Sequence, residues 1–155
     1  METIKKILVP IDFSDYSKKA LQYTVKFAKS FNSELYLIYV IEPMIYPADL
    51  SMGQMVIPPT EVNLDEKAKT ELEELAKTEI GDSLAYNIIV KTGKPFQEII
   101  ETAAEVDADL IIIATHGHTG VEHLLFGSTA EKVVRKAPCP VLTLREPIKG
   151  FRFKS

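Results

Sequence analysis

Glycine, histidine and hydroxyl side chains are concentrated in residues 114–129, which read ATHGHTGVEHLLFGST. Glycine lets the backbone approach a ligand closely and adopt angles that other residues avoid. The stretch leads into a segment with helical periodicity, and the N–H groups and dipole at a helix N-terminus attract anions. Residue types of this kind can serve phosphate binding, metal binding or a tight turn.

The end of this stretch has the pattern of a helix start. Ser128 is followed three residues later by Glu131, which predicts a capping box with Ser128 as the N-cap. Gly127 is expected to allow close approach and an unusual φ, and Gly117 and Gly120 to do the same in the preceding loop. Two glycine sites can frame a polyphosphate with main-chain donors. The alternative is that the glycines make turns and the serine only caps a helix.

The named phosphate-binding motifs are absent. Six residues separate Gly120 from Gly127 and no lysine precedes Ser128, which excludes a Walker loop. No G-x-G-x-x-G follows the first apolar run, which argues against a dinucleotide fold.

A metal site built from the three histidines is not favoured. His116, His118 and His123 match no standard zinc spacing, and Cys139 is distant in sequence. A divalent ion held through the phosphates of a nucleotide fits the loop better. Since Cys139 is the only cysteine, no intrachain disulfide is expected and a reducing compartment is indicated.

Short apolar runs alternate with longer segments of helical period along the chain. The predicted strands are residues 4–12, 34–42, 85–93, 108–116 and 139–145, and the predicted helices are 14–31, 64–80, a segment beginning at 95, and 128–136. This alternation predicts a single α/β domain with one parallel sheet and helices on both faces. Ligands of such sheets bind beyond the carboxyl ends of the strands, where the strand order reverses. The segments PIDFSD and ATHGHTG share that place only if the first and fourth strands are neighbours, which periodicity does not establish.

The composition excludes several classes of function. Eighteen Lys and Arg against 22 Asp and Glu give a net charge of −4 without a basic cluster, which argues against nucleic-acid binding. The N-terminus has no signal-peptide pattern, and no apolar run approaches the length of a membrane span. A cytoplasmic protein is expected.

The glycine-rich stretch resembles the nucleotide loop of the universal stress protein family, whose ATP-binding members carry Gly-x2-Gly-x9-Gly-Ser/Thr. Here the pattern is Ala114-x2-Gly117-x9-Gly127-Ser128. The resemblance continues through ILVPIDFS and APCPVLTLR, so it covers nearly the whole chain. Ala114 replaces the first glycine of the pattern. Its methyl group would crowd a phosphate if the backbone there needed a positive φ, but Ala114 continues a predicted strand, where alanine costs little.

The resemblance implies a five-stranded parallel sheet of order 3-2-1-4-5, an ATP site with Mg²⁺ bound through the phosphates, and a homodimer formed through the last strand, residues 141–145. Adenine and ribose would be bordered by Pro10, Ile11 and Asp12, with main-chain contacts from Val40. The phosphates would be surrounded by Gly117, His118, Gly127, Ser128 and Thr129, after Ala114. From the residues alone, Asp12 could instead serve the start of the helix at Ser14.

The expected organisation is a universal stress protein domain over residues 1–146 and a tail over 147–155. A Pro- and Met-rich loop at 43–62 is either a lid or contact surface or an unstructured insertion. The expected function is an ATP-binding module of the stress response, acting by binding or signalling with a protein partner that the sequence does not name. Two alternatives stay open. One is a nucleotide-free member that acts through protein contacts, and the other is a nucleotide-using enzyme, at most a slow ATP hydrolase assisted by His116 or His118.

Overall fold

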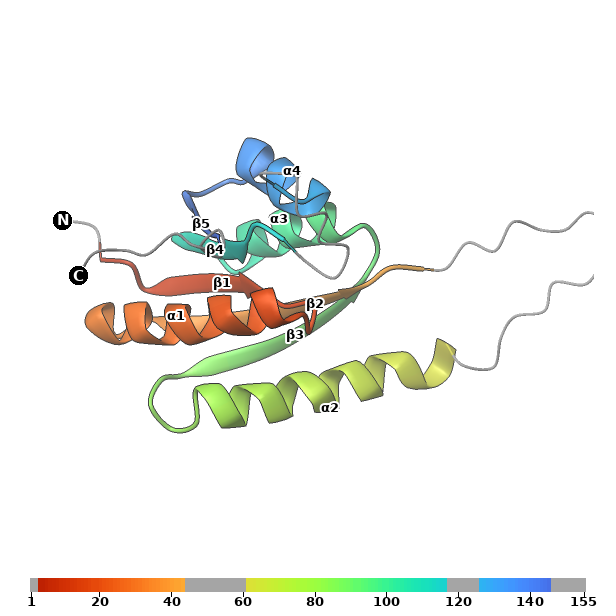
Figure 1. Cartoon of the computed structure of the whole chain (residues 1–155), viewed down its shortest axis with the longest axis horizontal. Coiled ribbons are helices and arrows are strands. Elements are labelled where there is room, and N and C mark those ends of the chain that lie inside the picture. The colour runs from red at the N-terminus through yellow and green to blue at the C-terminus, as the bar shows by residue number, and fades with distance from the viewer. Residues whose placement is uncertain (1–2, 44–60, 117–125, 146–155) are drawn as a thin grey trace, which may run out of the picture.

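The structure is a computed structural model that describes residues 3–43, 61–116 and 126–145. Strands and helices alternate along the described chain (Figure 1). The elements are β1 Lys6–Pro10, α1 Asp15–Phe31, β2 Glu34–Ile41, α2 Glu61–Glu79, β3 Tyr86–Thr92, α3 Pro95–Glu105, β4 Leu110–Ala114, α4 Ser128–Lys136 and β5 Val141–Leu144.

The five strands form one parallel sheet of order β3-β2-β1-β4-β5. This confirms the predicted fold class and strand order. β1 lies between β2, where Pro10 is level with Ile38, and β4, where Leu8 is level with Ile111. β1 and β4 are therefore neighbours, although nearly a hundred residues separate them.

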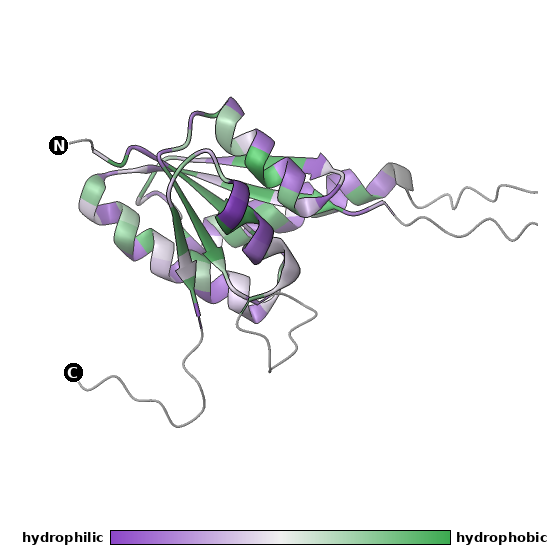
Figure 2. Ribbon diagram, turned by 90° about the horizontal axis from the view of Figure 1, so that it is seen from above, coloured by the Kyte–Doolittle hydropathy of each residue, from purple (hydrophilic) through white to green (hydrophobic). Residues whose placement is uncertain are grey.

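The helices bury two apolar cores against the two faces of the sheet. One core lies under α1 and α2 and includes Leu21, Leu72 and Ile112. The other lies under α3 and α4 and includes Ile99 and Val133. Figure 2 shows apolar strands between helices whose outer surfaces are polar. Strands covered on both faces are expected to be apolar along their whole length, which is why their runs do not alternate with polar residues.

The predicted elements agree with the structure except at their ends. α2 begins at Glu61, three residues before its predicted start, and its early residue Leu64 is 44% exposed. Phe31 of the predicted α1 stripe is 40% exposed, at the last residue of the helix. Gly81, predicted to suit the α2 C-terminus, has φ +55° and donates its N–H to the Ala76 carbonyl at 3.1 Å.

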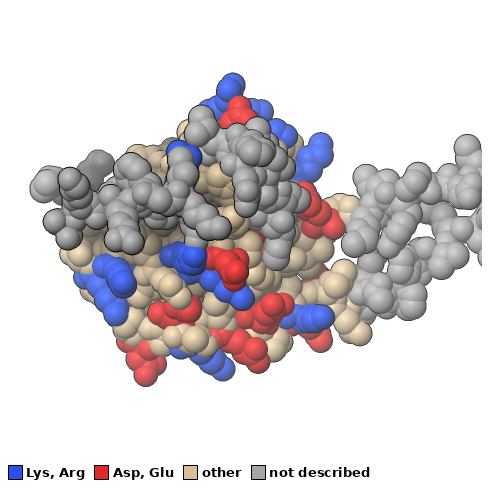
Figure 3. All heavy atoms as spheres, viewed as in Figure 1, with Lys and Arg blue, Asp and Glu red and all other residues tan. Residues whose placement is uncertain are grey.

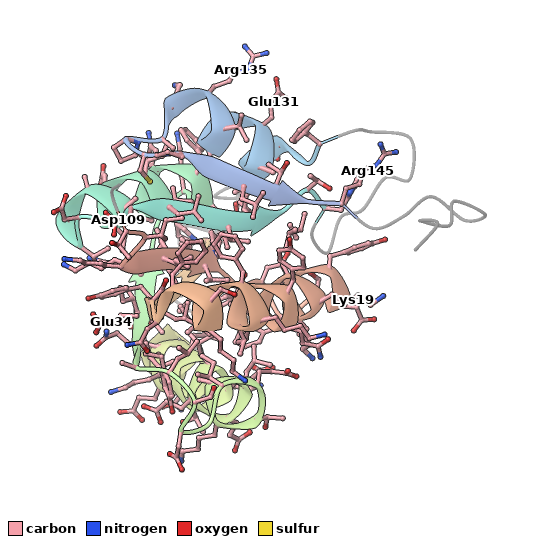
Figure 4. All side chains as sticks on the ribbon, turned by 90° about the vertical axis from the view of Figure 1, so that its left-hand side faces the viewer. Lys19, Glu34, Asp109, Glu131, Arg135 and Arg145 are labelled. Atoms are coloured by element: carbon pink, nitrogen blue, oxygen red, sulfur yellow. The ribbon has the colours of Figure 1, made fainter. Side chains whose placement is uncertain are left out.

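A carboxylate joins the amino ends of β1 and β4. Asp109 Oδ2 accepts the backbone N–H groups of Lys5 at 2.8 Å and Lys6 at 2.9 Å. Lys6 also donates its ammonium to the Val106 carbonyl at 3.0 Å. Figure 4 shows Asp109 at the end of the sheet opposite to Arg145. This contact fixes β1 and β4 at the edge of the sheet away from the glycine-rich stretch.

Charges of both signs are interspersed on the face of the molecule seen in Figure 3. None of the described helices is long and apolar enough to cross a membrane. Most of the 43–62 loop, the tail after Arg145, and residues 117–125 lie outside the described part of the chain.

Candidate functional site

The carboxyl ends of β1 and β4 mark the point where the strand order reverses. From β1 the chain continues to α1 on one face of the sheet, whereas β4 is followed, after the glycine-rich stretch, by α4 on the other face (Figure 1). Pro10 and Ala114 end these two adjacent strands. The two segments singled out in the sequence therefore leave the sheet side by side, at the usual ligand position of open α/β sheets.

The turn from β1 into α1 is held by its own side chains. Ile11 is buried and donates its N–H to the Ile38 carbonyl at 2.8 Å. Asp12 Oδ1 accepts the Ser14 N–H at 2.9 Å and also the Ser14 hydroxyl. Ser14 is the N-cap of α1, and its Oγ accepts the Ser17 N–H at 3.2 Å. Asp12 thus supports the cap of α1, as the alternative interpretation of this residue expects, without being the cap itself.

Phe13 in the same turn has a backbone conformation that is rare for its residue type. Its φ of +62° lies in the left-handed region, which costs a residue with a Cβ about 1–2 kcal/mol. The Phe13 ring packs on Tyr39 of β2 with centroids 4.9 Å apart, which helps hold the turn in place. Burial raises the pKa of Tyr39, and the nearby carboxylates of Glu71, Asp12 and Glu42 raise it further.

Thr115 connects three elements at the carboxyl end of β4. Its N–H donates to the Leu144 carbonyl of β5 at 3.0 Å, and its carbonyl accepts the Gly127 N–H at 2.6 Å. Its Oγ1 lies 3.0 Å from His116 Nδ1. The His116 ring in turn packs against Tyr16 in the first turn of α1, with centroids 5.8 Å apart. These contacts bring the starts of α1 and α4 to the same edge of the sheet.

Gly127 is required here for close approach and not for its backbone angles. Its φ of −67° and ψ of 158° are open to any residue, so the predicted unusual φ is wrong. A Cβ at this position, however, would lie 3.1 Å from the Thr115 carbonyl oxygen and 3.9 Å from the Cα of His116. The close approach seen at this position is that of the start of α4 to the end of β4. The expected approach of Gly127 to a phosphate stays a prediction.

The predicted capping box is wrong. α4 begins at Ser128, its N-cap is Gly127, and no side chain caps it. The helix starts one residue earlier than a Ser128 cap requires, because Gly127 is held against Thr115 and its carbonyl already accepts the Glu131 N–H at 3.0 Å. Glu131 instead pairs with Arg135 at 3.0 Å on the exposed side of α4.

The two helix N-termini at this edge therefore differ. α1 has a side-chain cap, since Ser14 Oγ accepts the Ser17 N–H of its first turn. In α4, the first-turn N–H groups of Ser128, Thr129 and Ala130 have no hydrogen-bond acceptor within the described residues. A free helix N-terminus with its aligned dipole is suited to an anion.

The remaining predicted site residues lie at the same edge of the sheet or outside the described chain. Val40 is half-buried near the end of β2, on the side of α3 and α4. Ala114 is half-buried, is level with Leu144, and does not have a positive φ, as expected for a residue that continues a strand. Thr129 is half-buried in the first turn of α4. Gly117 and His118 fall in residues 117–125, outside the described part.

Three residues of this edge were not found from the sequence. Thr115 lies at the end of the predicted strand 108–116 and could have been identified from that position alone. No sequence pattern singles out Tyr16 or Phe13. The contact of Tyr16 with His116 and that of Phe13 with Tyr39 depend on the order of the strands. Within the described ranges no group of three His, Cys, Asp or Glu side chains is placed to hold a metal ion.

Comparison with known proteins identifies close relatives over nearly the whole chain. The universal stress protein family matches residues 3–145. The universal stress protein MJ0531 of Methanocaldococcus jannaschii is 36% identical over 149 residues, covering 94% of this chain and 84% of the relative. The solved structure of MJ0577, described as a hypothetical protein in that work, has 30% identity and a TM-score of 0.79, covering 95% of this chain and 99% of MJ0577.

A more distant structure shares the fold. It is a universal stress protein in complex with cAMP, with 21% identity, a TM-score of 0.66, and coverage of 93% of this chain and 98% of its own. The family match spans all five strands and all four helices, as well as the edge at which β1 and β4 end. The chain therefore belongs to the universal stress protein family.

Proposed function

We propose that the protein binds an adenine nucleotide, ATP with Mg²⁺, at the carboxyl ends of β1 and β4. The observation that carries this proposal is the uncapped first turn of α4, held against the end of β4 by the close contact of Gly127 with Thr115. Free N–H groups at a helix N-terminus beside a glycine are a recurrent way of binding phosphate. A Cβ at Gly127 would lie 3.1 Å from the Thr115 carbonyl oxygen, so the glycine favours this close contact between the start of α4 and the end of β4.

The chain's own residues divide between the phosphates and the nucleoside. The N–H groups of Ser128 and Thr129 would donate to the phosphates, with the Ser128 hydroxyl as a further donor. Asp12, whose carboxylate also holds the start of α1 through Ser14, would border the ribose. Val40 in β2 and Ile11, directly after β1, would border the base. Mg²⁺ would be bound chiefly through the phosphates.

The fold neighbour with cAMP supports the adenine assignment. In that protein a universal stress protein fold binds adenine, ribose and one phosphate. In this chain, the glycine–serine pair at 127 and 128 leads into a helix without a side-chain cap, next to the carboxyl end of β4. The proposed role is one of binding or signalling, since Asp12, a carboxylate at this edge, is engaged in positioning the start of α1.

The protein is also proposed to form a homodimer through β5. β5 is the last strand of the sheet and pairs only with β4 among the described strands. Its residues Val141, Leu142 and Leu144 are apolar and partly buried. An unpaired apolar edge favours pairing with a second copy, and a two-fold axis closes that assembly.

The nucleotide proposal is tested on the purified full chain by two measurements. Mass spectrometry of the ligand released on denaturation should identify an adenine nucleotide, and calorimetry with ATP and Mg²⁺ should show binding at or below the millimolar range. If neither a released nucleotide nor binding at millimolar ATP is found, the protein is a nucleotide-free member that acts through protein contacts.

A further inference from the structure

We propose that Arg145 contacts the phosphate chain of the bound nucleotide and makes the site prefer a polyphosphate to a monophosphate. This inference rests on the proposed nucleotide function and adds the number of phosphates that the site selects. It is carried by the position, direction and charge environment of Arg145 in the structure.

The position of Arg145 follows from the pairing of β4 with β5. Ala114 is level with Leu144, and the Thr115 N–H donates to the Leu144 carbonyl at 3.0 Å. Arg145 is therefore beside Thr115, one residue beyond the end of β5. The Thr115 carbonyl accepts the Gly127 N–H at 2.6 Å. In space, Thr115 therefore lies between Arg145 and the start of α4.

The direction of Arg145 follows from the alternation of side chains along β5. Leu142 and Leu144 pack on the core under α1 and α2, whereas Val141 packs on the core under α3 and α4. Because successive residues of a strand point to opposite faces, Arg145 belongs to the face that carries α4. Figure 4 shows its side chain extending beyond the end of β5 and toward that face.

The charge of Arg145 is not balanced within the described chain. Arg145 is exposed and forms no ion pair with any described carboxylate. Arg135, at the other end of α4, is bound by Glu131 at 3.0 Å. A planar guanidinium matches the oxygens of a phosphate in a bidentate arrangement. An arginine that pairs with no described carboxylate, beside a helix start that no described side chain caps, is therefore suited to an extended anion.

The first-turn N–H groups of α4 and the Arg145 side chain would bind different phosphates of the nucleotide. The N–H groups of the α4 first turn are fixed in the backbone and suffice for one phosphate group. In this arrangement the second and third phosphates of ATP would extend beyond these groups, and the long side chain of Arg145 would supply a cation for them. ATP should therefore depend on Arg145 more strongly than AMP does.

The experiment is calorimetry of ATP and AMP, both with Mg²⁺, on the wild-type chain and the variants Arg145→Gln, Arg145→Lys and Arg135→Gln. Hydrogen bonds to a charged group are strong enough that Arg145→Gln should weaken ATP binding about tenfold or more. AMP binding should change by less than about twofold, which is small beside the tenfold change expected for ATP. Arg145→Lys retains the positive charge but not the planar guanidinium with its paired N–H donors, so it should bind ATP more tightly than Arg145→Gln and less tightly than the wild type.

Arg135→Gln is the matched control, because it removes the same charge from the far end of α4 and should leave both affinities unchanged. Circular dichroism and light scattering on each variant verify the fold and the mass. If the wild type binds ATP and Arg145→Gln weakens ATP and AMP equally, or weakens neither, the role of Arg145 is refuted while the nucleotide function stands. If the wild type binds neither nucleotide at millimolar concentration, the nucleotide function itself is refuted, and this inference with it.

Discussion

At the scale of single residues, Gly127 is the position where the site and the fold depend most on a missing side chain. In Gly127→Val, the Cβ would lie 3.1 Å from the Thr115 carbonyl oxygen, so the start of α4 must move away from β4. Overpacking of this kind costs about 1–3 kcal/mol of folding stability. ATP binding should be lost, because the first-turn N–H groups move with the helix. Calorimetry with ATP, together with urea unfolding, measures both effects.

Gly81→Ala provides the control for that loss of stability. Gly81 has φ +55°, and a Cβ there would have ordinary space, 3.6 Å from the Lys77 carbonyl oxygen. Alanine should therefore lower stability by about 1–2 kcal/mol through backbone strain alone. ATP affinity should remain that of the wild type. If Gly81→Ala weakened binding as much as Gly127→Val, the effect at Gly127 would be one of stability and not of the site.

The raised pKa of Tyr39 predicts how the free energy of unfolding changes at alkaline pH. Burial, followed by Glu71, Asp12 and Glu42, raises the pKa of Tyr39 above its ordinary value of 10.0. Above that pH the unfolded chain releases the phenol proton while the folded chain retains it, so the free energy of unfolding decreases as the pH rises. Tyr39→Phe should lose less stability between pH ~9 and pH ~11 than the wild type, as followed by urea unfolding. Equal losses in the two proteins would contradict this role of Tyr39.

At the scale of elements, the two helix N-termini of the site should respond differently to the same substitution. Ser14→Ala removes the N-cap of α1 and should cost about 1 kcal/mol of stability. Ser128→Ala removes no cap and should change stability by less than about 0.5 kcal/mol. Ser128→Ala should still weaken ATP binding, though less than Gly127→Val, because it removes a hydroxyl donor. Thermal unfolding and calorimetry separate the two effects, and a full capping cost at Ser128 would contradict the helix start described.

The start of α4 shows what a sequence can predict about an element. Its last residue, Lys136, and its periodicity were predictable from the spacing of apolar residues. Gly127 and Ser128 are both suitable N-caps, so the pattern could not decide between them. The decision depends on the hydrogen bond from Gly127 to Thr115, which no local rule contains. Phe13 is a similar case, since its positive φ is disfavoured by its own residue type and is held by packing on Tyr39.

At the scale of the whole molecule, the outer edge of β5 can be tested without breaking the sheet. The carbonyls of Pro140 and Leu144 accept N–H groups of β4. Backbone groups of successive residues in a strand point to opposite sides, so the N–H and carbonyl of Thr143, next to Leu144, face the outer edge of β5. Thr143→Pro removes one outward N–H and should convert the proposed dimer into a folded monomer. Light scattering at tens of micromolar (roughly 10⁻⁵ M, above the Kd of most standard-size interfaces) measures the mass, and circular dichroism verifies the fold.

Leu142→Pro is the matched control for this substitution. Leu142 alternates with Thr143 and faces β4, so proline there removes a bond within the sheet and should destabilise the protein itself. A wild-type monomer, or a Thr143→Pro variant with the mass of the wild-type dimer, would exclude assembly through β5.

The arrangement of the whole sheet was only partly accessible from the sequence. Apolar runs identified all five strands, and their alternation with helices predicted a parallel sheet. Periodicity carries no information about which strands are neighbours, so the adjacency of β1 and β4 came from the family resemblance. The contact between Tyr16 and His116 depends on that adjacency and was therefore not predictable from either residue.

The contact of Asp109 with Lys5 has a consequence for how the chain is made. It joins residues 104 positions apart, and β1 meets β4 only when both are available. A ribosome releases β1, β2 and β3 before β4, so a growing chain can form that part of the sheet first, while the long-range pairing of β1 with β4 comes later. The edge that would bind the nucleotide is thus completed only after β4 and α4 have been made. A ligand present in the cell would stabilise finished molecules by mass action and leave partial chains unaided.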